Sequence, residues 1–458
     1  MTQRTPKRIA LVLAVLVAAA SGCSRNSPTE PWPPDPIVFR ETVDFGLHQI
    51  EFKAFGGSKY DALSIDSTQH YSGNVSLKFT VPAPGDPSGG YAGGAFVASQ
   101  ARSLASFNAL SFYVKASRAT ILAEAGFGND NTGTSKYVAW RTSIPMTTEW
   151  TRVLIPIPLA AKLNFERGMF FVSEGPQGGT GLTFWVDDVT FVSDPSITNP
   201  NPGLSSQALS TVVGANVDLS GTTRTTFTIG AATVTVSHMP GYFSFTSSEP
   251  TVATVLNGVV QVVGTGSTTI TATLGALSAT GSLTLNAAAP PTIAAPTPGL
   301  ASSDVISIFS GAYPNVPAVN WRSFGSASAQ YSSLAIGGND TKAYTGLAYG
   351  YVGIEFKSPV VNATSMTHFH MDVWMTSGSR LLVKLVDFGA NGIYGADDTS
   401  HELTFNDVST PPYALGAWVS LDIPFTSFTG LTNRAHLAQL ILSGDTPTVF
   451  VDNIYFHK

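Results

Sequence analysis

We predict an all-β fold from this sequence, and three observations support the prediction. Charged residues make up only 12% of the chain, which also contains 43 Gly and 29 Pro. Many segments alternate apolar and polar residues between Gly-rich turns, a pattern typical of short antiparallel strands. Pro-rich polar stretches at 24–36, 194–204 and 286–299 resemble linkers. They divide the chain into three segments of ordinary domain size, 37–194, 205–287 and 300–458.

The N-terminus predicts export. Lys7 and Arg8 precede a short apolar run that ends in Ala20-Ser21-Gly22-Cys23. A positive start, an apolar core and a small-residue site are typical of a secretory signal, and the run is too short to span a membrane. We therefore predict a signal peptide over 1–22. The alternative for the single Cys is an ordinary signal peptide with an incidental thiol.

Ala20-Ser-Gly-Cys23 also resembles the bacterial lipobox, in which the Cys receives the lipid. The resemblance implies lipidation at Cys23, a Pro-rich tether over 23–36, and membrane contact only through this anchor. Ser24 follows the Cys, and in lipoprotein sorting such a residue permits transfer to the outer membrane. We expect an outer-membrane protein that faces the cell surface.

Composition limits the partners. The net charge is −6 without basic clusters, so nucleic acid is not an expected partner. No Cys follows position 23, so no disulfide can form within the mature chain.

The first segment, 37–194, carries three strings of a known type. His70–Phe79 resembles the "HSGxxSLK" strand of jelly-roll carbohydrate-binding modules, Glu149–Pro156 resembles their "WxxxxIP" strand, and Phe184–Phe191 resembles their closing "DDV" strand. The resemblance implies a β-sandwich jelly roll that binds carbohydrate. Trp140 and Tyr91 are the aromatic candidates for sugar stacking, and core filling is the alternative for Trp140.

The second segment, 205–287, resembles a group 2 bacterial Ig-like domain. The strings Phe245–Val255, Gly258–Val263 and Gly264–Thr273 carry the resemblance. It implies a small Ig-like β-sandwich. Its polar residues are Ser and Thr on solvent faces, so we interpret it as a spacer between the two larger modules.

The third segment, 300–458, resembles the accessory module of laminarinase-like β-glucanases. The strings Val305–Tyr313, Gly338–Phe356, Met366–Trp374 and Trp418–Phe428 carry the resemblance. It implies a second jelly roll and glycan binding, with β-1,3-glucan as the ligand.

Strand alternation defines the candidate site in this segment. Period-two geometry places Phe369, Met371 and Val373 in the core. The opposite face, which we predict to bind carbohydrate through stacking and hydrogen bonds, then consists of His368, His370, Asp372 and Trp374. Glu355 also alternates out of its core and is expected on this polar face.

Two alternatives remain for this face. The histidines can be solvated or structurally hydrogen-bonded while Trp374 covers a strand edge. His368, His370 and Asp372 can instead ligate zinc.

Asp187 and Asp452 occupy equivalent points of the two closing strands. In jelly-roll carbohydrate-binding modules this Asp commonly ligates structural calcium, so the resemblance implies the same role here. The alternative is a hydrogen bond that pins a loop without metal. We expect no organic cofactor.

We do not expect an enzyme. Laminarinase-like hydrolases carry their carboxylates in a Glu-x-Asp-x-x-Glu strand, and this string is absent. Gly-x-Ser-x-Gly and His-Glu-x-x-His are absent as well. The predicted function is non-catalytic glycan binding at the cell surface, and the alternative is a structural or adhesive lipoprotein that binds protein partners.

Overall fold

The computed structural model describes residues 35–41 and 50–458. The predicted signal peptide 1–22, Cys23 and positions 24–34 of the tether lie outside the described residues. Regular structure in the described ranges is β-strand, apart from four single-turn 3₁₀ helices: η1 (Ala160–Lys162), η2 (Pro240–Tyr242), η3 (Ser302–Asp304) and η4 (Phe425–Ser427). The all-β prediction is confirmed. Among these residues, no helix has the length and apolar character that crossing a membrane requires.

The first module, residues 35–194, is a sandwich of two sheets. One sheet contains, in spatial order, β3 (Leu63–Asp66), β4 (Ser76–Val81), β11 (Leu182–Val192), β6 (Ala109–Ala116) and β9 (Thr151–Pro156), and β1 (Ile37–Phe39) also pairs with β11. The facing sheet contains β8 (Ala139–Met146), β7 (Thr120–Phe127), β10 (Glu166–Glu174), β5 (Ala92–Arg102) and β2 (Ile50–Ala54).

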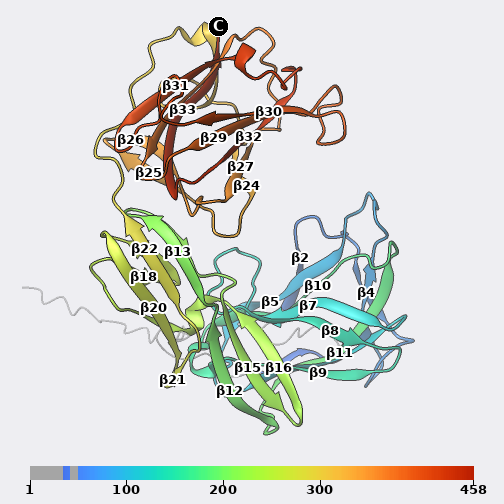
Figure 1. Ribbon diagram of the computed structural model, residues 1–458. Helices are drawn as coiled ribbons and strands as arrows, with labels where there is room; N and C mark the ends of the chain where they lie inside the picture. Colours follow the sequence, from blue (N-terminus) through green and yellow to red (C-terminus); the bar gives the residue numbers. More distant parts are fainter. Residues whose placement is uncertain (1–34, 42–49) are drawn as a thin grey trace, which may run out of the picture.

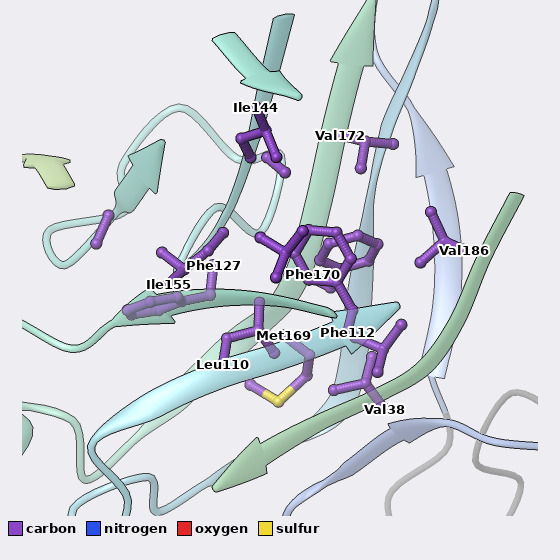
Figure 2. Packing of buried hydrophobic residues seen from close by; sticks show 14 of the residues in the cluster. Val38, Leu110, Phe112, Phe127, Ile144, Ile155, Met169, Phe170, Val172 and Val186 are labelled. Atoms are coloured by element: carbon purple, nitrogen blue, oxygen red, sulfur yellow. The ribbon is translucent and has the colours of Figure 1, made fainter. Parts of the chain in front are cut away.

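The core of the first module lies between these sheets. Leu110, Phe112 and Val114 are fully buried, as the alternation of this strand predicts. Figure 2 shows Phe112 beside Phe170 of the facing sheet, and their ring centroids are 5.2 Å apart. Truncating such a buried ring typically costs about 3 to 5 kcal/mol of stability.

Three further strands extend the facing sheet to eight. Beyond β8 lie β16 (Ala232–His238), β15 (Thr223–Ile229) and β12 (Ile197–Leu204), as Figure 1 shows in green. The linker expected at 194–204 is therefore wrong for most of its length, because 197–204 forms an edge strand. Pro200 and Pro202 are compatible with this strand because it lies at the edge of the sheet, which is where proline is tolerated.

The remainder of the middle segment, residues 205–222 and 239–288, forms a small sandwich. One sheet has the order β13 (Gln207–Val212), β22 (Leu283–Ala288), β20 (Gly266–Leu274) and β17 (Ser244–Ser247), and β21 (Leu277–Ser278) also pairs with β20. The other sheet has the order β14 (Asn216–Asp218), β19 (Val259–Val262) and β18 (Ala253–Leu256).

The third module, residues 300–458, repeats the strand order of the first. Its larger sheet contains β25 (Gln330–Ile336), β26 (Asn339–Thr345), β33 (Thr448–His457), β28 (His368–Met375) and β31 (Trp418–Pro424), and β23 (Val305–Phe309) pairs with β33. The facing sheet contains β24 (Asn320–Gly325), β27 (Tyr351–Glu355), β32 (Leu437–Gly444), β29 (Leu381–Asp387) and β30 (Thr399–Phe405). Taken in chain order, each strand of one module has a counterpart in the other.

The middle segment packs against both modules. Tyr242 and Phe243 belong to the same buried cluster as the first module's core. At the other end, Val212 and Val262 join a buried cluster with Ile336 and Phe450 of the third module. The three parts are therefore in continuous apolar contact along the chain.

The linker expected at 286–299 is bound along much of its length. We call residues 289–299 the strap. The Ile293 carbonyl accepts a hydrogen bond from Trp418 Nε1 at 2.9 Å, and the Pro296 carbonyl accepts one from Asn453 Nδ2 at 2.8 Å. These bonds fix the strap to the larger sheet of the third module.

Candidate functional site

The candidate site is a groove on the outer face of the five-stranded sheet in the third module. It encloses about 540 Å³ and crosses β24, β27, β32, β29 and β30. The opposite face of this sheet carries core residues such as Ile354 and Leu440, which are fully buried. Strand alternation therefore directs the intervening side chains into the groove.

Two rows of residues form the groove floor. Register pairing places Phe324, Gly353, Ile441 and Lys384 side by side on four neighbouring strands. The next row consists of Glu355, Gln439, Val386 and Ser400. The first row thus supplies the aromatic surface of Phe324 and the aliphatic surface of Ile441. The second row supplies the hydrogen-bonding groups of Glu355, Gln439 and Ser400.

The ring of Phe324 lies over Gly353. A Cβ atom built at Gly353 would come within 2.2–2.4 Å of three ring atoms, so only glycine leaves room for the ring there. Tyr394, from the loop after β29, also lines the groove and is 74% exposed. Aromatic faces of this kind can stack against the apolar face of a pyranose ring.

Glu355 is held by three donors. Its Oε2 accepts hydrogen bonds from the Ser323 hydroxyl at 2.6 Å and from Lys357 Nζ at 2.9 Å, and its Oε1 accepts one from Gln439 Nε2 at 2.8 Å. Burial raises the pKa of Glu355, but these hydrogen bonds outweigh burial and hold the pKa below its ordinary value. The carboxylate is therefore ionised at neutral pH and fixes the Gln439 amide in the groove.

Glu355 does not share a face with the other predicted site residues. His368, His370, Asp372 and Trp374 lie on β28, which belongs to the six-stranded sheet on the other side of the sandwich. The prediction that Glu355 sits on their polar face is wrong. Alternation along each strand was read correctly, but it does not indicate which sheet a strand joins.

The face of β28 is largely covered. Trp374 packs edge to face against Trp418, with ring centroids 5.9 Å apart, and both contact the buried cluster shared with the middle segment. Asp372 is 1% exposed, and its Oδ2 accepts a hydrogen bond from Asn453, which also bonds to the strap. Trp374 therefore lies at the interface between the middle segment and the third module, where its ring packs against protein and is not open for sugar stacking.

The histidines of this face make structural contacts. The His370 ring stacks on Tyr455 at 4.4 Å, and its Nδ1 lies 3.5 Å from Asp422 Oδ1. His368 stacks on His457 at 5.0 Å, and His457 Nε2 lies 2.7 Å from the same Asp422 oxygen. These contacts support the structural alternative. Within 35–41 and 50–458, no group of three or more His, Cys, Asp or Glu could hold a metal ion.

Asp187 and Asp452 occupy equivalent places on β11 and β33. Each accepts a hydrogen bond at Oδ1 from the next backbone N–H at 2.7 Å, and that next residue has a positive φ, 47° at Asp188 and 49° at Asn453. Burial raises the pKa of both carboxyls. The pKa of Asp452 rises to about 6, because the charge of Asp372 adds to the effect of burial while hydrogen bonds to Asp452 oppose it.

The second oxygen of each aspartate is also occupied. Asp187 Oδ2 accepts the N–H groups of Tyr71 and Ser72 at 2.7 and 3.2 Å. Asp452 Oδ2 accepts Asn339 Nδ2 at 2.8 Å. Calcium needs six to eight oxygen ligands, and the described residues around these aspartates offer donors instead. They do not fit a calcium ion, and the contacts favour the loop-pinning alternative.

Trp140 lies on the outer face of the extended sheet. It pairs with Ser237 of β16 and is half-buried against Val97 and Phe171, which are each 2% exposed. The loop after β7 crosses toward this face, and Asn131 Nδ2 donates to the Ala54 carbonyl at 3.2 Å. Trp140 thus borders a covered apolar patch, in contrast to the open groove of the third module.

The sequence interpretation missed four groove residues: Phe324, Lys384, Tyr394 and Gln439. One signal was present, because a glycine inside an alternating strand, as in Tyr351-Val-Gly-Ile-Glu355, indicates close approach of a neighbouring group. The identity of that group depends on long-range strand pairing.

The match to a protein family lies in the first module. No curated protein matches the chain. Among solved structures, a family 30 carbohydrate-binding module of the cellulosomal cellulase Cel9D-Cel44B of Clostridium thermocellum is 17% identical, with a TM-score of 0.23, and covers 36% of this chain and 96% of its own. A CBM22-1-CBM22-2 tandem domain of Paenibacillus barcinonensis Xyn10C is 12% identical, with a TM-score of 0.24, and covers 93% of this chain and 98% of its own. Residues 35–193 match the family model described as carbohydrate binding domain 30.

Proposed function

We propose that this protein is a non-catalytic glycan-binding protein and that the third-module groove binds a β-glucan chain. The observation that carries the proposal is the Phe324 ring lying over Gly353 beside the Glu355–Gln439 pair. A stacking surface next to fixed amide and carboxylate groups suits a sugar ring, which has apolar faces and hydroxyl edges.

The first module supports the same class of function. Its residues match a carbohydrate-binding family model, and the third module repeats its strand order in both sheets. Two modules of one kind on one chain can bind a repeating polysaccharide with greater avidity than either module alone.

The ligand class can be tested with a panel of polysaccharides. Isothermal titration of the purified protein against laminarin, mixed-linkage β-glucan, cellohexaose and dextran should show binding to at least one β-glucan and none to the α-linked dextran. Absence of binding to every β-glucan would contradict the proposal and favour a structural or adhesive role.

We further propose that lipid attached to Cys23 anchors the protein in the outer membrane with its modules at the cell surface. The Ala20-Ser21-Gly22-Cys23 string supports this proposal. Cys23→Ala should move the protein from the membrane fraction to the soluble fraction. Tight membrane association of that variant would contradict the anchor, without bearing on the groove.

A further inference from the structure

A second groove lies where the first module meets the middle segment. It consists of two adjoining hollows of about 370 and 450 Å³, and both are lined by Ser135, Lys136, Tyr137 and Lys162. The first hollow is completed by first-module residues such as Phe165, and the second by middle-segment residues such as Asn257. Both volumes fall within the range of ligand sites, which often form at boundaries between domains.

Backbone contacts fix the walls of this junction groove. The Tyr242 hydroxyl donates to the Tyr137 carbonyl at 2.8 Å, and the Met239 N–H donates to the Val138 carbonyl at 2.9 Å. A Cβ atom at Gly241 would lie 2.5 Å from the Lys136 carbonyl oxygen, so glycine is needed for this close approach. The groove is therefore preformed.

The groove carries excess positive charge. Lys136 and Lys162 make no ion pair with any described residue, and Arg167 adds a third cationic side chain to the first hollow. Two carboxyls oppose them. Asp130 is engaged by the Thr132 and Ser135 hydroxyls, both at 2.6 Å. Burial, with a smaller contribution from Asp130, raises the pKa of Glu166 to about 7, so Glu166 is only partly ionised at neutral pH.

Neutral groups complete the lining. Phe165 is 42% exposed at the first hollow, which also contains Asn164, and Tyr137 faces both hollows. Ser220 and Asn257 line the second hollow. This lining offers aromatic surface and hydrogen-bonding groups along two consecutive hollows, an arrangement suited to a chain of sugar rings.

We propose that the junction groove binds an anionic glycan strand, with its negative groups beside Lys136 and Lys162 and its rings against Tyr137 and Phe165. The negative groups are uronate carboxylates or sulfate esters, which share the charge that the lysines recognise. This site is separate from the third-module groove. Its second hollow exists only because the middle segment packs against the first module, so the two segments contribute jointly to recognition.

Isothermal titration of the purified protein with three probes tests the proposal. Tetragalacturonate supplies carboxylates, a carrageenan tetrasaccharide supplies sulfates, and cellotetraose is neutral. At least one anionic probe should bind, with an affinity that falls as salt is raised. The anionic probe that binds more tightly identifies the recognised group, and equal binding indicates that charge alone is recognised.

Variants locate the site. Lys136→Ala/Lys162→Ala should weaken binding of the anionic probe roughly tenfold or more. Lys78→Ala/Lys115→Ala removes the same charge from the opposite sheet and should leave that affinity unchanged. Lys78 and Lys115 are half-buried and contact Asp66 and Gln69, so thermal melting must verify that both double variants fold.

Three results would overturn the proposal: no binding of either anionic probe, equal weakening by the two lysine pairs, or undiminished binding in Lys136→Ala/Lys162→Ala. Cellotetraose keeps the two proposals distinct. If it fails to bind while an anionic probe binds at the junction, the junction site stands and the third-module groove loses support.

Discussion

Phe324 and Gly353 lie side by side on β24 and β27, and the glycine allows the aromatic ring to rest on the sheet. Gly353→Ala places a methyl group where three ring atoms now lie, so the ring must move. Because β24 is an edge strand, we expect the fold to survive and the affinity for a β-glucan to fall roughly tenfold, about 1.4 kcal/mol. Titration and thermal melting measure the two effects separately. Unchanged affinity in the folded variant would show that the ring position is irrelevant to binding.

Trp374 is predicted to stabilise an interface and to contribute nothing directly to glycan affinity. Trp374→Ala removes a half-buried ring from the cluster shared by the middle segment and the third module. We expect a loss of about 2 kcal/mol in stability, below the cost of a fully buried Trp, and faster proteolysis near the strap. Calorimetry and limited digestion with the broadly specific proteinase K check this expectation, because no Lys or Arg lies between Arg224 and Arg322 for trypsin to cleave. A large loss of β-glucan affinity with unchanged stability would instead restore the face of β28 as the binding site.

His238 makes the junction sensitive to acid. It is fully buried, its Nδ1 donates to the Met239 carbonyl at 3.1 Å, and burial lowers its pKa from 6.5 to about 4. In the unfolded chain His238 binds a proton as the pH falls through 6.5, whereas the folded chain does not until about pH 4. Its contribution of roughly 3 kcal/mol is therefore complete above pH 6.5 and is lost as the pH falls toward 4.

The measurement for His238 is the difference in unfolding free energy between wild type and His238→Asn, compared at pH 7 and pH 5. The comparison with the variant is needed because the raised pKa values of Asp452 and Glu166 have the opposite effect on stability. Both carboxyls destabilise the fold as the pH rises, and the variant keeps both of them. Asparagine keeps a neutral donor and should show a smaller loss on acidification. If the unfolding free energy falls by the same amount in both proteins between pH 7 and pH 5, His238 is not the cause of the acid sensitivity.

Asp187 is predicted to act without metal. Asp187→Ala leaves three backbone N–H groups, those of Tyr71, Ser72 and Asp188, without their present acceptor. Each such group that stays buried and unsatisfied costs about 1 to 3 kcal/mol, so the first module should be strongly destabilised. Chelation by EDTA should leave the melting temperature of the wild type unchanged. A lower melting temperature in EDTA, restored by added calcium, would instead support the calcium prediction.

Local patterns in the sequence predicted much of this architecture. The core positions Phe369, Met371 and Val373 are fully buried, because side-chain alternation is a local property of a strand. Strand pairing is not local. Gln439 reaches Glu355 across 84 residues, and Trp418 meets Trp374 through the register of β28 and β31. The groove and the covered face therefore could not be distinguished from the sequence alone.

The Pro-rich stretches show the same limit. Composition correctly indicated that the described residues are mainly β-strand, but 197–204 became an edge strand and the strap became a bound segment. Proline excludes a central strand position and permits an edge position, so its presence does not by itself define a flexible linker. The boundaries of the three segments remain predictions.

The central claim is that the third-module groove binds a glucan chain on Phe324. Phe324→Ala should weaken binding of the preferred β-glucan about tenfold or more in isothermal titration, since the ring supplies the stacking surface. Tyr349→Ala is the matched control, because Tyr349 is 88% exposed and does not line the groove. We expect weaker binding in the Phe324→Ala variant and wild-type binding in the Tyr349→Ala variant. Wild-type affinity in a folded Phe324→Ala protein would contradict it.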